Sequence, residues 1–110
     1  MQFGSWFPLD SAEVPEAPGV FQIRVERGLL GYPRGKSAMV AYGAGADLRA
    51  AVQALVRGAV GERARAHAPL LVRWVVLAPA SDPDAVLSRL RERFVAQFGT
   101  RPAAEAEAKE

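Results

Sequence analysis

Two segments decide the fold: PGVFQIRVER at residues 18–27 and AMVAYGAGADLR at residues 38–49. In the first segment apolar side chains alternate with polar ones, and the apolar positions are Phe21, Ile23 and Val25. Such alternation is typical of a strand that buries one face, so we expect a strand over residues 19–27. The second segment begins with an apolar run that predicts another strand over residues 38–42. Glycines and a proline between the two segments predict a turn, so the strands should pair as a hairpin.

A helix is predicted directly after the second strand. Gly43 and Gly45 interrupt the strand, and the carboxylate of Asp47 can accept hydrogen bonds from the free N–H groups of a first helical turn. Apolar residues then recur at helical spacing at Leu48, Val52, Leu55 and Val56. This spacing predicts an amphipathic helix with one solvated face. Residues 62–67 can form either a further helical turn or a solvated loop.

A third strand and a second helix complete the pattern. Residues 70–78 are apolar except for Arg73, which predicts a strand that is buried on both faces and central in the sheet. The stretch Ser81-Asp82-Pro83-Asp84 is typical of a helix start, and we assign the capping role to Ser81. The apolar stripe of that helix consists of Leu87, Leu90, Phe94 and Phe98. Gly99 is expected to end it.

The predicted order of elements is therefore β-β-α-β-α. We expect a small α/β domain of the α+β kind, with a three-stranded, mostly antiparallel sheet and two helices packed on it. Three parts are predicted: a proline-rich arm over residues 1–18 that packs on the domain, the domain itself over residues 19–101, and a flexible Ala/Glu tail over residues 102–110. Within the arm, Trp6 and Phe7 either anchor a partner or pack on the sheet.

The composition is that of an ordinary globular domain. Half of the 110 residues are apolar and 24% are charged, which excludes the disordered class of chains. The absence of cysteine excludes disulfides and thiolate metal sites, and a single histidine excludes His-based zinc sites and triads. No stretch has the pattern of a signal peptide or a membrane span, so we expect a soluble, cytoplasmic protein without membrane contact.

Arginine dominates the basic residues. The chain has twelve arginines and two lysines, and its formal net charge is +2. The planar arginine fork binds phosphate well, so this preference is consistent with phosphate binding. A GC-rich genome would produce the same Ala-, Arg-, Val- and Gly-rich vocabulary, and both explanations stay open.

Three short stretches together carry a resemblance to a known family: Pro18-Gly19-Val20-Phe21, Val40-Ala41-Tyr42-Gly43 and Ala46-Asp47-Leu48-Arg49. They resemble the start of a GIY-YIG domain, in which two paired strands carry the Gly-Ile-Tyr and Tyr-Ile-Gly triplets and a helix opens on an Asn/Asp-Leu step. The resemblance spans roughly residues 15–102. It implies a nuclease fold that cuts DNA phosphodiesters with tyrosines from both triplets, an arginine on the first helix and a metal-binding glutamate on a later one.

The catalytic positions that the resemblance implies hold inert residues in this chain. The first tyrosine falls on Phe21, which keeps the ring and lacks the hydroxyl. The second falls on Ala41, and Tyr42, one place later, is expected on the opposite face of the strand. The helix arginine falls on Ala51, and Arg49 lies about 200° away around the helix.

The metal-binding glutamate and the strand connection also differ from the family pattern. Glu92 is the nearest candidate for the glutamate, although the apolar stripe places Arg91 closer to the expected position. The segment between the two triplets is longer than usual. Since each missing group would contribute about 10²–10³-fold or more to the rate, we expect a non-catalytic relative without a cofactor or metal.

These observations leave three hypotheses for the function. The first is a GIY-YIG-like binding or scaffolding module that recognises a protein partner. The second is sequence-independent nucleic-acid binding through arginines on a helix face, with the candidates Arg49, Arg57, Arg63 and Arg65. The third is a divergent endonuclease that uses a divalent metal ion with Tyr42, Arg49 and Glu92, and it requires these three side chains to converge on one cleft.

Overall fold

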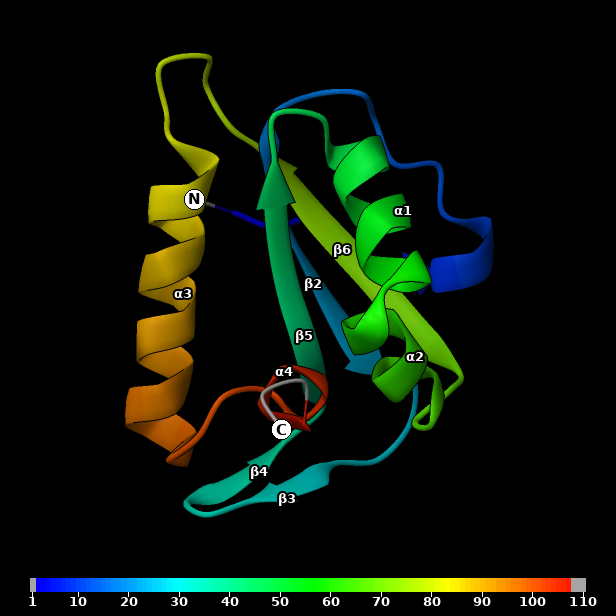
Figure 1. The fold of residues 1–110 in the computed structure, drawn as a ribbon, viewed down its shortest axis with the longest axis vertical. Coiled ribbons are helices and arrows are strands. Elements are labelled where there is room, and N and C mark those ends of the chain that lie inside the picture. The colour runs from blue at the N-terminus through cyan, green and yellow to red at the C-terminus, as the bar shows by residue number, and fades with distance from the viewer. Residues whose placement is uncertain (1, 108–110) are drawn as a thin grey trace.

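The computed structural model describes residues 2–107, which form an α+β fold around a four-stranded antiparallel sheet (Figure 1). The strand order is β1-β6-β2-β5. The bounds are Phe7–Pro8 for β1, Gly19–Val25 for β2, Met39–Gly45 for β5 and Leu70–Val76 for β6. The remaining strands, β3 (Leu30–Tyr32) and β4 (Gly35–Ser37), form a separate two-stranded ribbon. Among residues 2–107, no helix combines the length and the apolar character needed to cross a bilayer.

The predicted hairpin is present, because β2 and β5 pair antiparallel from Gly19↔Gly45 onward. The prediction of three strands was wrong. The fourth strand comes from the arm, where Phe7 and Pro8 pair with β6. The prolines of the arm predicted no regular element. Pro8 is nevertheless accommodated in β1, because β1 is an edge strand and the missing N–H of a proline is not needed there. The long connection between the two triplets, which we expected to be only a turn, forms the β3–β4 ribbon.

The central strand is also not the predicted one. We expected residues 70–78 to be central, but β6 has only the two-residue β1 on its outer side. The strand with long neighbours on both sides is β2, which pairs with β5 and β6. Six of its seven residues are buried, including the polar Gln22. The alternation in β2 predicted one exposed face, and this was wrong because Gln22 is buried and Arg24 lies under the Trp6 ring.

Within residues 2–107, four α-helices pack around the sheet, where two were predicted. They are α1 (Leu48–Arg57), α2 (Ala59–Arg65), α3 (Pro83–Phe98) and α4 (Ala103–Glu107). Figure 1 shows α1 and α2 on one side of the sheet and α3 on the other. Asp47 caps α1 by accepting a hydrogen bond from the N–H of Ala50, as predicted. The cap of α3 is Asp82 rather than Ser81, and its carboxylate accepts from the N–H of Asp84.

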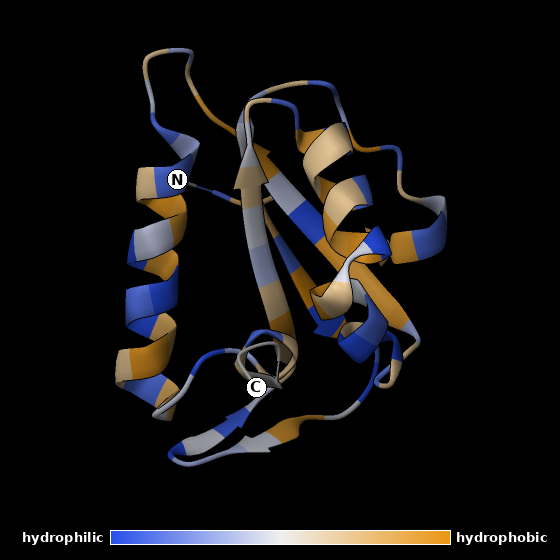
Figure 2. Cartoon of the chain, in the orientation of Figure 1, coloured by the Kyte–Doolittle hydropathy of each residue, from blue (hydrophilic) through white to orange (hydrophobic). Residues whose placement is uncertain are grey.

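Two apolar clusters form the core, one on each face of the sheet. The cluster under α1 and α2 includes Phe21, Ile23, Ala41, Leu48 and Val52. The cluster under α3 consists of Val20, Tyr42, Val86, Leu87 and Phe94, with partly buried neighbours around it. Figure 2 shows that hydrophilic segments interrupt the hydrophobic colour of β2 and β6 within the sheet. Gln22 of β2 and Arg73 of β6 contribute to these interruptions, and they lie on the same face as Tyr42, the face under α3.

The C-terminal segment differs from the predicted flexible tail. Pro102 and Ala104 are fully buried, and the N–H of Ala103 donates to the hydroxyl of Tyr32 in the ribbon. Figure 1 shows α4 at the lower end of β5, between α3 and α2. Small alanine side chains allow this close packing. Composition alone could not distinguish such a docked helix from a frayed end. Residues 108–110 of the predicted tail lie outside the described residues.

Candidate functional site

The three inert positions of the nuclease-like motif lie together on one face of the sheet. Phe21 on β2 and Ala41 on β5 are 1% and 0% exposed, and both belong to the apolar cluster under α1. Ala51 of α1 packs against the same cluster. The helix that follows the hairpin therefore covers the two strand positions directly. We call the group of Phe21, Ala41 and Ala51 the motif pocket.

The motif pocket is filled by side chains. The ring of Phe21 lies against the backbone of Gly43, so that a Cβ at position 43 would overlap the ring. Leu48 and Val52 of α1 and Val14 of the arm close the cluster, and each is no more than 7% exposed. All its buried members are apolar. Such packing offers no ligand to a cation and no donor to a phosphate.

The structure does not bring Tyr42, Arg49 and Glu92 together. Tyr42 packs on the α3 face, opposite the motif pocket, with its ring 5.9 Å from that of Phe94. Arg49 lies on α1, across the sheet, where it pairs with Glu16 at 3.0 Å and donates to the carbonyl of Val14 at 2.9 Å. Glu92 is exposed on α3. The convergence that a divergent nuclease requires is therefore absent for these three residues.

The hydroxyl of Tyr42 is also unsuited to act as a base. Burial raises the pKa of Tyr42 to about 12, the nearby Glu105 and Tyr32 act in the same direction, and Arg73 opposes them. A group of this pKa stays protonated at neutral pH, whereas an effective general base titrates near the working pH. Tyr42 can donate a hydrogen bond there but cannot take up a proton.

Arg91 and Glu105 together cover the free edge of β5. Glu105 accepts a hydrogen bond from the backbone N–H of Tyr42 at 2.9 Å, and Arg91 lies 3.5 Å from the Tyr42 carbonyl oxygen. The two side chains form an ion pair, in which Arg91 Nε lies 2.6 Å from Glu105 Oε1. The pair replaces the neighbouring strand that an edge strand lacks, and so protects the edge from pairing with another chain.

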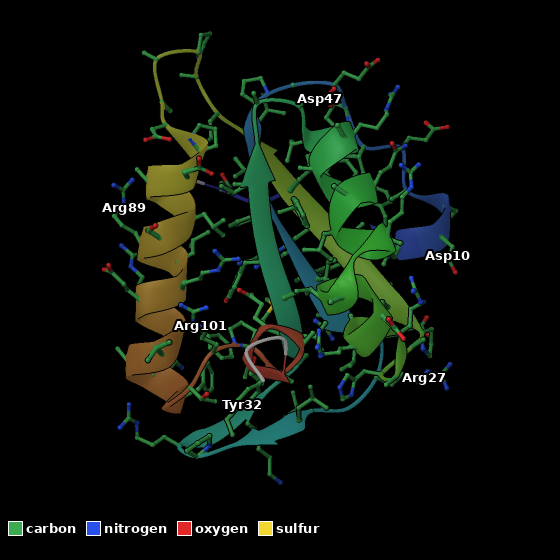
Figure 3. The ribbon with its side chains drawn as sticks, viewed as in Figure 1. Asp10, Arg27, Tyr32, Asp47, Arg89 and Arg101 are labelled. Carbon is green, nitrogen blue, oxygen red and sulfur yellow. The ribbon has the colours of Figure 1, made fainter. Side chains whose placement is uncertain are left out.

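Burial has the largest effect on the pKa of Glu105. Its side chain is 5% exposed, and the loss of hydration raises the pKa of Glu105 above the ordinary value. The hydrogen bond from Tyr42 and the charges of Arg91 and Arg101 act in the opposite direction without overcoming it. Figure 3 shows Arg101 in the connection between α3 and α4. The carboxylate is thus held as a structural bridge between α4, β5 and α3.

The four arginines proposed for nucleic-acid binding are only partly available. Arg49 is paired with Glu16, Arg65 donates to the carbonyl of Val56 at 2.8 Å, and Arg63 is partly buried. Arg57 is exposed and lines a groove of about 620 Å³ between the arm and α1.

That groove carries charges of both signs. Arg49 and Arg57 line it from α1, and Asp10 and Glu13 line it from the arm. Figure 3 shows Asp10 on the arm, on the same side of the sheet as α1. The carboxylates oppose the approach of a polyanion to this face.

Neither a metal cluster nor a known relative identifies the site. Within residues 2–107, no group of three or more His, Cys, Asp or Glu side chains is placed to hold a metal ion. No family model, curated protein or solved structure matches the chain.

The sequence reasoning missed the polar residues of the α3 face. Glu105 was placed in a tail, and Arg91 was considered only as a mismatch to a metal ligand. Arg73 was noted only as an interruption of an apolar strand. That interruption was a usable signal, because a charged residue within a buried strand needs a partner. The partner is Gln22, whose Oε1 accepts from Arg73 Nε at 2.6 Å.

Proposed function

We propose that this chain is a non-catalytic, GIY-YIG-like binding module. One observation carries the proposal: the three positions that would hold the reactive groups are occupied by Phe21, Ala41 and Ala51, which pack together in the core. A phosphodiesterase needs an activated water, a cation for the developing charge and usually a metal ion. The closed apolar packing of the motif pocket excludes all three from this place.

The proposed partner is a protein that contacts the arm beside β6. Phe7 is 45% exposed and stacks on Trp74, with the ring centroids 5.6 Å apart. Both residues line a hollow of about 310 Å³ together with Ser11, Ala12 and Glu13. Exposed aromatic side chains next to a hollow are typical anchors of protein interfaces. This supports the interpretation of Phe7 as an anchor, whereas Trp6 packs on the sheet beside Arg24 and Arg73.

The first test is a cleavage assay. Plasmid and short duplex DNA are incubated with the purified chain in Mg²⁺ or Mn²⁺, and the matched controls are Glu92→Gln and Tyr42→Phe. We expect no cleavage above that of either control. Metal-dependent cleavage that both substitutions abolish would show that the chain is an active nuclease and would end the proposal.

The second test concerns the partner. A photo-crosslinking residue placed at position 7 should capture one protein in cells, and the same residue at position 29 should not. Leu29 is 62% exposed and is therefore a matched exposed apolar position. The purified partner should bind the Phe7→Ala variant at least about tenfold more weakly, as expected for an aromatic anchor, and Leu29→Ala should bind like the wild type. Equal binding by both variants would place the interface elsewhere.

A second candidate function, sequence-independent nucleic-acid binding, is favoured by the many arginines without carboxylate partners. Among the side chains that the structure describes, the two ion pairs engage only Arg49 and Arg91. Binding through phosphates releases counterions, so the affinity for DNA would fall steeply with added salt. Absence of binding at low salt would exclude this function.

A further inference from the structure

A row of polar side chains crosses the three long strands on the α3 face. Gln22 of β2 stands opposite Tyr42 of β5 on one side and opposite Arg73 of β6 on the other. Residues directly opposite one another on paired strands point to the same face, so the three side chains lie side by side. Arg24 follows two residues after Gln22 on the same face of β2. We call these four residues the donor row.

The donor row offers hydrogen-bond donors, and the side-chain oxygen of Gln22, an acceptor within it, is already engaged. Arg73 Nε donates to Gln22 Oε1, which turns the amide nitrogen of Gln22 away from Arg73. Gln22 is 6% exposed, so this orientation is held within the core. In the part of the chain that the structure describes, no hydrogen bond engages the Gln22 amide nitrogen, the Tyr42 hydroxyl or the terminal nitrogens of Arg73.

The charge of the donor row is not balanced by a carboxylate. The two ion pairs found among the described side chains lie elsewhere, at Arg49–Glu16 and Arg91–Glu105. Burial lowers the pKa of Arg73, and the neighbouring Arg24 lowers it further, while Tyr42 opposes both. Two partly buried guanidinium groups beside each other repel, and an anion between them would remove the repulsion.

Aromatic rings of the arm hold the two guanidinium groups in place. The Trp6 ring lies 4.4 Å from Arg73 and 5.3 Å from Arg24, and the Phe3 ring lies 4.9 Å from Arg73. Such cation–π contacts also attach the arm to the sheet. The ring faces contact the two guanidinium groups, but they do not use the donors of Gln22 and Tyr42.

We propose that the donor row is a binding site for a phosphate group. A tetrahedral phosphate has more acceptor oxygens than a carboxylate, and here donors from Arg24, Arg73, Gln22 and Tyr42 come from three adjacent strands. The forked guanidinium suits this geometry. The site goes beyond the proposed protein-binding function and does not depend on it, because it lies on the face of the sheet opposite the motif pocket. The phosphate belongs either to a small phosphate ester or to a nucleic-acid backbone.

The test measures binding of inorganic phosphate and pyrophosphate to the full chain at low salt. Trp6 fluorescence in a Trp74→Phe background reports binding, since Trp6 touches both guanidinium groups. Arg73→Gln and Arg24→Gln should each weaken binding about tenfold or more, the effect expected for loss of a charge-assisted hydrogen bond. Arg89→Gln is the matched control, because Arg89 points away from the sheet on α3 (Figure 3). It should leave the affinity unchanged.

Two further measurements make the result decisive. Nucleoside monophosphate is compared with an oligonucleotide that lacks terminal phosphates, and preference for one of them identifies the source of the phosphate. Thermal unfolding verifies that each variant folds, and the milder Tyr42→Phe variant, which removes one donor, should weaken binding if Arg73→Gln does not fold. The proposal is overturned if 10 mM phosphate or pyrophosphate does not bind, or if Arg89→Gln weakens binding as much as Arg73→Gln. If the arginine variants lose stability and the wild type binds no phosphate, the proposal is also overturned, and the role of Arg24 and Arg73 is to attach the arm to the sheet.

Discussion

The two faces of the sheet use the same strands for opposite purposes. On the α1 face, successive inward positions of β2 hold Phe21, Ile23 and Val25, which belong to one apolar cluster. On the α3 face, the intervening positions hold Gln22 and Arg24, beside an apolar cluster that includes Val20 and Phe94. One strand thus carries a closed core on one side and polar chemistry on the other.

The comparison shows which face can bind a ligand. The α1 face is where a nuclease-like motif would place its reactive groups, and its cluster includes the fully buried Phe21, Ala41 and Leu48. The α3 face was expected to be the solvated side of a half-buried strand, and it holds the buried amide of Gln22, the Tyr42 hydroxyl and the Glu105 carboxylate. Glu105 is partnered by the Tyr42 N–H and by Arg91, whereas the amide nitrogen of Gln22 and the Tyr42 hydroxyl have no hydrogen-bond partner among the described residues. The α3 face therefore keeps donors that a ligand could use.

The largest expected effect comes from breaking the α1 face at Phe21. Phe21→Ala removes a ring that is 1% exposed, and we expect the free energy of unfolding to fall by about 3–5 kcal/mol, measured by urea denaturation. Phe21→Tyr adds a hydroxyl over Gly43, in apolar surroundings, and should cost about 1–3 kcal/mol. A Tyr variant as stable as the wild type would show that the motif pocket still accepts a polar group.

A second change to the same face adds volume instead of removing it. Gly43→Ala places a methyl group against the buried ring of Phe21, and overpacking of this kind should cost about 1–3 kcal/mol. Gly31→Ala is the matched control, because a Cβ at Gly31 meets no atom within 4 Å. Its stability should lie within about 0.5 kcal/mol of the wild type. Equal losses from both substitutions would mean that the ring of Phe21 is not fixed against Gly43.

The elements that the sequence predicted well are those with a local signal. The strand β2, the Asp47 cap and the glycine stop at Gly99 all follow from neighbouring residues, and the structure has each of them, although β2 is buried on both faces. The missed elements depend on distant partners. β1 exists only because Phe7 and Pro8 meet β6, and α4 is held by Tyr32 and by the edge of β5. A pattern within one short window contains no information about such partners.

The candidate sites divide in the same way. The missing hydroxyl at Phe21 can be read directly from the sequence. The opposite orientations of Ala41 and Tyr42 could be predicted because strand periodicity is local. The meeting of Gln22, Tyr42 and Arg73 requires the register of three strands, of which β6 lies about fifty residues further along the chain. Glu105 could not be placed, since alanine-rich segments of this kind occur both as frayed ends and as docked helices.

On the α3 face, the bridge made by Glu105 can be broken with a smaller and more local effect. Glu105→Ala leaves the Tyr42 N–H without its acceptor and Arg91 without its counter-charge, and should cost about 1–3 kcal/mol in urea denaturation. Glu105→Gln keeps an acceptor and should cost less. Glu92→Ala removes an exposed carboxylate from α3 and should change the stability by no more than about 0.5 kcal/mol. A loss from Glu92→Ala as large as that from Glu105→Ala would refute the bridge.

The pH dependence of stability distinguishes the α3 face from the α1 face, which has no titrating group in its cluster. The pKa of Tyr42 is raised from 10.0 to about 12, so the folded state favours the protonated hydroxyl. Its contribution is fully present below pH 10 and is lost as the pH rises through 12, with about 1 kcal/mol lost by pH 11. Tyr42→Phe should remove this part of the alkaline decline, measured as the wild-type minus variant stability at pH 8 and pH 11. A difference that stays constant between these two pH values would show that the hydroxyl is not perturbed.

The smallest expected effect is at the surface of the α1 face, where Arg49 and Glu16 form an exposed ion pair with side chains that are 50% and 67% exposed. Glu16→Gln should cost less than about 1 kcal/mol, and 1 M salt should abolish the difference from the wild type. Arg49→Gln should cost more than Glu16→Gln, because the guanidinium also donates to the carbonyl of Val14 and so attaches the arm to α1. In 1 M salt this excess should persist, since a hydrogen bond to a carbonyl is screened far less than an exposed ion pair. If both variants became equal to the wild type at high salt, Arg49 would act through its charge alone, and its hydrogen bond to Val14 would add nothing measurable to the attachment of the arm.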